Sequence, residues 1–162
     1  MKLALAIGEV AGAERRLADG LLEVGERHRA DHDVFHVTRT LSELERGHVA
    51  MLEPHAERHG AAIDADGAEP NGRGLLDRAM EKGAELVGRA PEASLALLGD
   101  LRRLHELAAR ASIEWVILGQ GAQAARDEEL LSVVGACHPE TLRTLKWTTY
   151  RIKEAAPQTL LT

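Results

Sequence analysis

Glu45 and His48 stand three residues apart in the stretch SELERGHVAML, which has the composition of a helix. Residues at this spacing lie on one side of an α-helix, so a carboxylate and an imidazole can act on one ligand. Both fall on a stripe that is otherwise largely apolar and that reads Leu41, Glu45, His48, Leu52, His55 and His59. We therefore expect Glu45 and His48 to point into a protein core, where they could bind a metal ion.

A glutamate of the preceding segment is predicted to meet this pair. Apolar residues recur at helical spacing over residues 3–24, and Glu14 occupies one position of their stripe. We place the turn between the two helices near Asp31. Glu14 lies as far before that turn as His48 lies after it, and Glu45 is one helical turn nearer. At about 1.5 Å of rise per residue, the three side chains reach similar heights.

Two carboxylates and an imidazole on facing buried stripes need partners, because an unpaired buried charge costs on the order of several kcal/mol. One partner is a divalent ion, and this oxygen and nitrogen ligand set suits iron, manganese or zinc. The other is a metal-free hydrogen-bonded network, completed by an arginine such as Arg110. The sequence leaves both alternatives open. A bound ion would suit metal storage, scavenging or redox chemistry, whereas a metal-free network would suit a structural or partner-binding protein.

The whole pattern predicts an all-α fold in one domain, residues 1–162. Aromatic residues make up only 2% of the chain, so the core must be aliphatic, which suits helices. Short links join the first helix to the second and the third to the fourth, which predicts two antiparallel hairpins. The long connection over residues 60–89 ends in a shorter helical pattern at 75–89 and is long enough to cross along the bundle.

Capping residues and prolines set the expected helix ends. The second helix should run from about residue 34 to about residue 59, with Asp31 or Asp33 as its N-cap and Gly60 closing it. The third should open at Pro91, and the fourth should follow Asp127 as its N-cap. Pro139 lies inside the fourth helical pattern, where we expect it to kink or split the helix.

Residues 13–52 resemble the first hairpin of the ferritin-like, rubrerythrin-like superfamily. In that superfamily a four-helix bundle holds two iron ions with one glutamate from each of two helices and a Glu-x-x-His from each of the other two. The resemblance implies that Glu14 is the glutamate of the first helix and that Glu45 with His48 is the Glu-x-x-His of the second. It also implies a ferritin-like bundle, a crossover that carries a short extra helix, bound iron or manganese, and pairing as a homodimer.

The second half of the chain departs from this pattern. Glu114 is the candidate ligand of the third helix, but no Glu-x-x-His follows it. The sequence spacing from Glu14 to the Glu-x-x-His pair, carried forward from Glu114, leads to Leu145 and Thr148. We therefore expect at most a half-site for one ion and no complete di-iron enzyme centre, with ligands drawn from Glu14, Glu45, His48 and Glu114.

The remaining polar residues are predicted to be structural. His28, His32 and His36 recur at every fourth position, and the first two are expected to be exposed near a turn. Cys137 is the only cysteine, so it forms no internal disulfide and is expected to be a small core residue. Glu140 is expected on a solvated face.

Charge and composition limit the kinds of partner that we expect for this protein. The net charge is −6 and basic residues are mixed with acidic ones, which argues against nucleic acid. No apolar run is long enough for a membrane span, and Glu9 interrupts the short apolar start. A single cysteine fits the cytoplasm, and the excess of arginine over lysine with abundant alanine, glycine and leucine suggests a bacterial protein. The segment 147–161, with Trp147, Tyr150, Ile152 and Leu160, is a candidate surface for docking a second subunit. A carrier of an apolar ligand bound between the helices is a third possibility, although no residue marks such a ligand.

Overall fold

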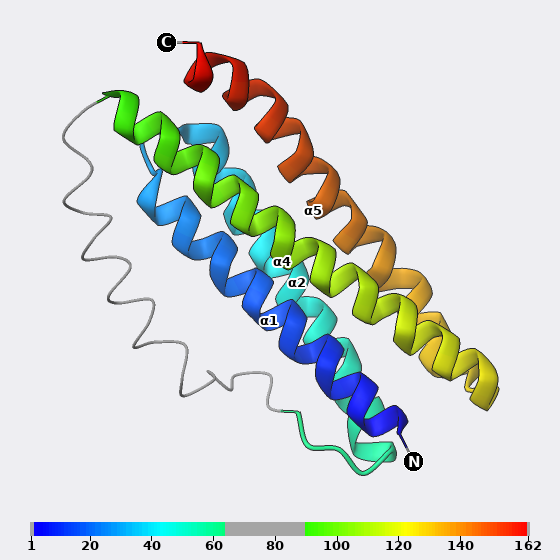
Figure 1. Cartoon of the computed structure of the whole chain (residues 1–162). Coiled ribbons are helices and arrows are strands. Elements are labelled where there is room, and N and C mark those ends of the chain that lie inside the picture. The colour runs from blue at the N-terminus through cyan, green and yellow to red at the C-terminus, as the bar shows by residue number, and fades with distance from the viewer. Residues whose placement is uncertain (1, 64–89, 162) are drawn as a thin grey trace.

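The computed structural model describes residues 2–63 and 90–161, and within these residues every regular element is an α-helix. The elements are α1 (Leu3–Arg27), α2 (His32–Arg58), α4 (Ala90–Ala125) and α5 (Glu128–Leu160), arranged as a bundle (Figure 1). The predicted all-α bundle of four long helices is thus confirmed. The shorter helix predicted at residues 75–89 lies outside the described residues. Among the described helices, none is both long and apolar enough to cross a membrane.

The predicted caps are present. The side chain of Asp31 accepts a hydrogen bond from the backbone N–H of Val34 at 3.1 Å, and Asp127 does the same for Leu130 at 3.1 Å. Each carboxylate also lies at the positive end of its helix, which favours a negative charge. Gly60 follows α2 with a φ of 77°, a left-handed conformation that glycine adopts without strain.

Pro139 does not split α5, which continues through it as one helix. A proline removes one backbone N–H and leaves the carbonyl four residues earlier without its helical partner. That carbonyl belongs to Gly135, which is exposed, so water can hydrogen-bond to it. The predicted split of the helix was wrong, because the lost bond falls on the solvent side of the helix.

Neighbouring helices run antiparallel. The hairpin of α1 and α2 packs on the hairpin of α4 and α5, with α1 against α4 and α2 against α5. At one end of the bundle, Arg27 of α1 donates to Asp100 near the start of α4 at 2.6 Å. At the other end, His59 beyond α2 lies 2.9 Å from Asp127 before α5. The end of α2 and the start of α4 therefore lie at opposite ends of the bundle (Figure 1), as a crossover connection requires.

The apolar core is divided into two clusters. One contains Ile7, Leu52 and Leu118, and the other contains Leu21 and Leu104, all fully buried. Both clusters draw on all four helices. Along α1, α2 and α5, the buried glutamate, histidine and threonine side chains that form the candidate site lie at the boundary between them.

The hairpin of α1 and α2 depends on a close approach at Gly25. A Cβ atom at Gly25 would lie 2.2 Å from Oγ1 of Thr38, which is fully buried and donates to the carbonyl of Val34. We predict that Gly25→Ala lowers the free energy of unfolding by about 1–3 kcal/mol, because the two helices must move apart. Gly8→Ala is the matched control in the same helix, where nothing lies within 4 Å of the added Cβ.

The control should raise the free energy of unfolding by roughly 0.5–1 kcal/mol, because alanine has the higher helix propensity. Urea titration followed by circular dichroism measures both variants. A Gly25→Ala protein as stable as the Gly8→Ala protein would show that the close approach does not constrain the hairpin.

Candidate metal centre

Three of the four candidate ligands meet in the middle of the bundle. Glu14 of α1 and Glu45 of α2 are 0% exposed, and His48 of α2 is 1% exposed. Nδ1 of His48 lies 2.9 Å from Oε2 of Glu45 and 3.5 Å from Oε2 of Glu14. We call these residues the Glu–Glu–His cluster. In the described parts of the chain, no other group of three acidic, histidine or cysteine side chains converges in this way.

The two oxygens of each carboxylate have different surroundings. Oε1 of Glu14 accepts hydrogen bonds from the indole N–H of Trp115 and from the hydroxyl of Thr141, the latter at 2.8 Å. Oε1 of Glu45 accepts from the hydroxyl of Thr144 at 2.6 Å. These donors come from α4 and α5. Thr141 also donates to Oε2 of Glu45, at the longer distance of 3.4 Å, whereas Oε2 of Glu14 has no donor. Both Oε2 atoms face the imidazole of His48.

Two buried atoms in the cluster have no hydrogen-bond partner. They are Oε2 of Glu14 and Nδ1 of His48. The approach of Nδ1 to Oε2 of Glu45 is short, but it lies off the direction of a hydrogen bond. Buried polar atoms are nearly always satisfied, and leaving one unsatisfied costs about 1–3 kcal/mol. The two unsatisfied atoms point to a missing group between them.

A divalent ion fits this gap. An ion about 2.0–2.2 Å from each ligand holds neighbouring ligand atoms roughly 3.0 Å apart at right angles and roughly 3.4 Å apart in a tetrahedron. The two distances from Nδ1 to the Oε2 atoms, 2.9 Å and 3.5 Å, are of this size. The potential ligand atoms of Glu14, Glu45 and His48 all lie within 4.8 Å of one another. One imidazole and two carboxylates can therefore hold one metal ion.

Glu140 lies next to the cluster on α5. Its Oε2 lies 2.9 Å from Nε2 of His48, and its side chain is 31% exposed. Glu140 is thus partly exposed, as expected, but its contact with His48 was not predicted from the sequence. A carboxylate at Nε2 holds a proton on that nitrogen and leaves Nδ1 unprotonated for a metal, as in many metal-bound histidines.

The polar residues contributed by α5 were missed at the sequence level. The buried stripe of this helix includes Cys137, Thr141, Thr144 and Thr148, which follow one another at helical spacing. That spacing was the available signal. It was overlooked because threonine is common on both buried and exposed surfaces, and because the nearby Leu145, which a hydrophobic pattern favours for the core, is only half-buried.

Glu114 is not brought into the cluster. It is 6% exposed and pairs with Arg110 at 2.6 Å on the side of α4 that faces α1, where Glu9 lies 3.8 Å from the same arginine. The adjacent Trp115 takes the interior position, and successive helical residues point about 100° apart. Arg110, the example of an arginine that could complete a metal-free network, therefore does not reach the Glu–Glu–His cluster, and Trp115 with the threonines donates to the carboxylates instead.

The other candidate residues have structural partners. His32 and His36 are exposed, but His28 is largely covered and lies 2.7 Å from Asp100, so its predicted exposure was wrong. Cys137 is buried, and burial together with the nearby glutamates raises the pKa of its thiol to about 12. This thiol stays protonated at neutral pH, which suits a core residue rather than a nucleophile.

The three side chains of the Glu–Glu–His cluster strongly influence one another's pKa values. Burial and the neighbouring Glu45 raise the pKa of Glu14 to about 7, against the opposing effect of His48. Burial would raise the pKa of Glu45, but contacts with His48, Glu14 and Thr144 outweigh it and lower that pKa. Burial would lower the pKa of His48, yet the contacts with Glu14 and Glu45 raise it to about 10. Without metal, the cluster holds an imidazolium beside one ionised carboxylate.

The directions of these pKa shifts can be tested on the metal-free protein. The folded pKa of His48, about 10, lies above its ordinary value of 6.5. Its imidazolium therefore stabilises the fold fully below about pH 6.5, and this stabilisation is lost as the pH rises towards 10. We predict that NMR of EDTA-treated protein with labelled histidine follows His48 to a midpoint near pH 10, and to the ordinary value in urea.

Glu45→Gln removes the nearer carboxylate and should lower the His48 midpoint by at least about one pH unit. A His48 midpoint at or below the ordinary histidine value in the folded protein would contradict the charge distribution described above.

Comparison of the chain with protein-family models, with curated proteins and with solved structures finds no match. No relative therefore assigns a role to the Glu–Glu–His cluster, and its chemistry follows from its geometry.

Proposed function

We propose that this protein is a ferritin-like bundle that binds a single divalent metal ion, iron or manganese, through Glu14, Glu45 and His48. One observation carries the proposal: Oε2 of Glu14 and Nδ1 of His48 are buried without hydrogen-bond partners and face the same space as Oε2 of Glu45. An ion in that space would satisfy all three atoms at once. The oxygen and nitrogen ligands suit iron, manganese or zinc.

The surroundings support one ion rather than two. A second ion would need carboxylates from α4 and α5 on the far side of the cluster. Trp115, Thr141 and Thr144 stand there instead, and their N–H and O–H groups point at the Oε1 atoms. These side chains donate hydrogen bonds and bring no carboxylate or imidazole to that side, so the ligand set for a second ion is missing there. The proposed centre is therefore mononuclear.

The ferritin-like part of the proposal rests on arrangement. A glutamate of α1 and a Glu-x-x-His of α2 meet at mid-height, and α2 and α4 are joined from opposite ends of the bundle. This matches the ligand placement of one half of a di-iron site in a bundle with a crossover connection. Fold alone does not define a function, so the metal site carries the functional conclusion.

We assign metal binding rather than catalysis. A bound iron or manganese ion would supply Lewis acidity and redox chemistry. The chain's own residues hold the ion, orient His48 through Glu140 and exclude water with an apolar cluster on either side. Because Glu14, Glu45 and His48 are at most 1% exposed, this conformation offers no open surface at the ion to a substrate.

A second candidate is a metal-free structural bundle. It is favoured by the donors on α4 and α5, which satisfy both Oε1 atoms, and by the high pKa of His48, which lets an imidazolium neutralise a carboxylate. On this alternative the cluster fixes the packing of the helices and takes no ion. The two candidates differ in metal content, which can be measured directly.

We predict that protein stripped of metal and then supplied with Fe(II) without oxygen, or with Mn(II), retains about one equivalent after desalting. Elemental analysis measures it. Glu45→Gln and His48→Gln should each abolish retention, because two ligands alone hold a divalent ion weakly. The matched control is Glu114→Gln, which changes a buried glutamate outside the cluster and should retain the ion.

Circular dichroism confirms that each variant is folded. Wild-type protein that holds no stoichiometric metal would refute the metal site and leave the metal-free bundle. Loss of metal in Glu114→Gln as well would show that the ligand set is not the Glu–Glu–His cluster.

Glu140→Gln tests the outer carboxylate at His48. We predict that this variant still holds one ion but that its dissociation constant rises about 10-fold, the lower end of the usual effect of losing such a partner. Competition with a chelating dye measures the constant. Glu106→Gln, an exposed change on α4, is the control and should bind as wild type does. Equal affinity for the two variants would mean that Glu140 does not position His48.

A further inference from the structure

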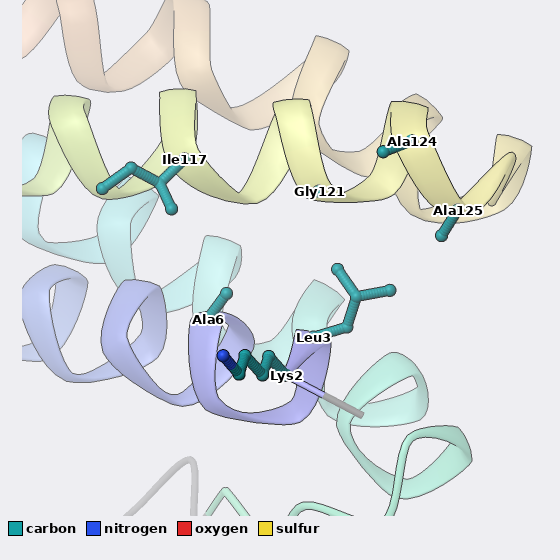
Figure 2. Close-up of a pocket in the computed structure, with 7 residues that line it drawn as sticks. All are labelled: Lys2, Leu3, Ala6, Ile117, Gly121, Ala124 and Ala125. Atoms are coloured by element: carbon teal, nitrogen blue, oxygen red, sulfur yellow. The ribbon is translucent and has the colours of Figure 1, made fainter.

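Among the described residues, two features outside the Glu–Glu–His cluster could bind a ligand. One is a groove of about 440 Å³ between the first turns of α1 and the last turns of α4 (Figure 2). All of its lining residues except Lys2 are apolar, so it has few groups that could orient a ligand. The other feature is a pair of exposed histidines at the start of α2, His32 and His36. Imidazoles bind a definite class of ligand, and this pair is the more informative feature.

His32 and His36 lie on one side of α2. They are four residues apart in the sequence HDVFH, and the centroids of their imidazole rings are 6.1 Å apart. Helices that bind zinc through two histidines use this spacing, with an acidic residue directly after the first histidine. Asp33 occupies that position in α2. The spacing and the residue types therefore match those of a helical metal site.

The rings of His32 and His36 are not engaged by other polar groups. In the part of the chain that the structure describes, neither ring makes a hydrogen bond or an ion pair. A second pair with the same spacing lies at the end of α2 and differs in this respect. There, Nδ1 of His55 lies 3.1 Å from an arginine, and Nε2 of His59 lies 2.9 Å from an aspartate. Only the pair at the start of α2 leaves all of its ring nitrogens available to a ligand.

The separation of the two rings suits one ion after a small movement. An ion about 2.0–2.1 Å from one nitrogen of each imidazole would hold the ring centroids roughly 4.5–5.2 Å apart, for angles at the ion from a right angle to a tetrahedral one. The rings of His32 and His36 are somewhat further apart than this, at 6.1 Å. Both side chains are exposed, so small rotations about their side-chain bonds can close the difference without displacing packed residues.

The charges near the pair are compatible with a bound cation. Asp33 is exposed in the first turn of α2, directly after His32 and three residues before His36. Its carboxylate offsets the partial positive charge of the helix N-terminus, which would otherwise repel an ion. Arg39 lies one turn after His36, but its guanidinium is held over the ring of Phe35 at 5.2 Å and pairs with a glutamate of α1 at 3.0 Å. The charge of that arginine is therefore already paired.

The type of ligand atom selects the class of metal. Imidazole nitrogen suits copper, nickel and zinc, whereas magnesium and manganese favour oxygen ligands. For a given site, affinity rises from manganese to nickel and copper and falls again at zinc. Two imidazoles with water in the remaining positions should therefore bind Cu(II) most tightly, Ni(II) and Zn(II) less tightly, and Mn(II) very weakly.

From these observations we infer that His32 and His36 form a surface metal site that chelates one late divalent transition-metal ion, Cu(II) most tightly. Asp33 supplies the compensating negative charge. The ion links the first two turns of α2 and leaves coordination positions open to water. The inference does not depend on the proposed central ion, because the two sites share no residue and differ in ligand atoms and in exposure.

NMR of EDTA-treated protein with labelled histidine locates the site directly, because a paramagnetic Cu(II) ion broadens the signals of nuclei close to it. At a small fraction of one equivalent of Cu(II), the signals of His32 and His36 should broaden, and those of His55 and His59 should persist. The same result is expected in His48→Gln, which lacks the proposed central site. The response of the surface pair therefore does not depend on whether the central site takes copper.

Calorimetric titration of His48→Gln with Cu(II) measures affinity at the surface pair alone. Adding His32→Gln or His36→Gln should weaken binding at least about 10-fold, because a single imidazole loses the second one that the helix holds nearby. Asp33→Asn should weaken it several-fold through the lost charge. His55→Gln is the matched control, since it removes a histidine of the same helix from the engaged pair, and it should bind as the parent does. Circular dichroism confirms that each variant is folded.

Four results would overturn the inference. They are equal broadening of all histidine signals, unchanged Cu(II) affinity in both His32→Gln and His36→Gln, an equal loss of affinity in His55→Gln, and Mn(II) bound at this pair as tightly as Cu(II). None of them bears on retention of iron or manganese by the Glu–Glu–His cluster, so failure of one site can be told apart from failure of the other.

Discussion

The contact of one imidazole with two carboxylates in the centre of the bundle is the constraint on which the rest of the structure depends. Taking Glu14, Glu45 and His48 out of water is costly unless each charge finds partners. Every helix contributes either one of these charged groups or a partner for one of them. α1 and α2 supply the charged groups, α4 supplies an indole N–H, and α5 supplies two hydroxyls and a carboxylate. The apolar core is divided in two because this polar layer occupies its middle.

The same ion-pair arrangement occurs at both ends of the bundle, where an arginine and a histidine bind an aspartate. Arg27 and His28 at the end of α1 bind Asp100, and Arg58 and His59 at the end of α2 bind Asp127. The two Arg-His pairs have the same separation along the chain as Glu14 and Glu45. Contacts with His28 and Arg27 outweigh the effect of burial and lower the pKa of Asp100. These ion pairs fix the level of the second hairpin against the first, which brings Thr141 and Thr144 to the height of the glutamates.

The sequence predicted the first hairpin far better than its partner. Glu14, Glu45 and His48 could be placed together because a short turn joins their helices, so residue number converts directly to height. The N-caps at Asp31 and Asp127 were equally local. No such rule relates the two hairpins, since a long connection leaves their relative level and rotation free. The contact of Glu140 with His48, and the interior position of Trp115 in place of Glu114, depend on how the second hairpin is rotated against the first. The periodicity of residues along one helix gives no information on that rotation.

The donors on α4 and α5 give the centre two properties at once. Trp115, Thr141 and Thr144 donate mainly to the Oε1 atoms, so the Oε2 atoms face His48, where the proposed centre would hold one ion. The same donors stabilise the ionised carboxylate when no ion is present, with the proton on His48 supplying the positive charge. A metal ion at the proposed centre would compete with protons for the same atoms, Oε2 of Glu14 and Nδ1 of His48. A bundle built in this way needs no metal to pair the charges of the cluster, and its geometry would still fit one ion.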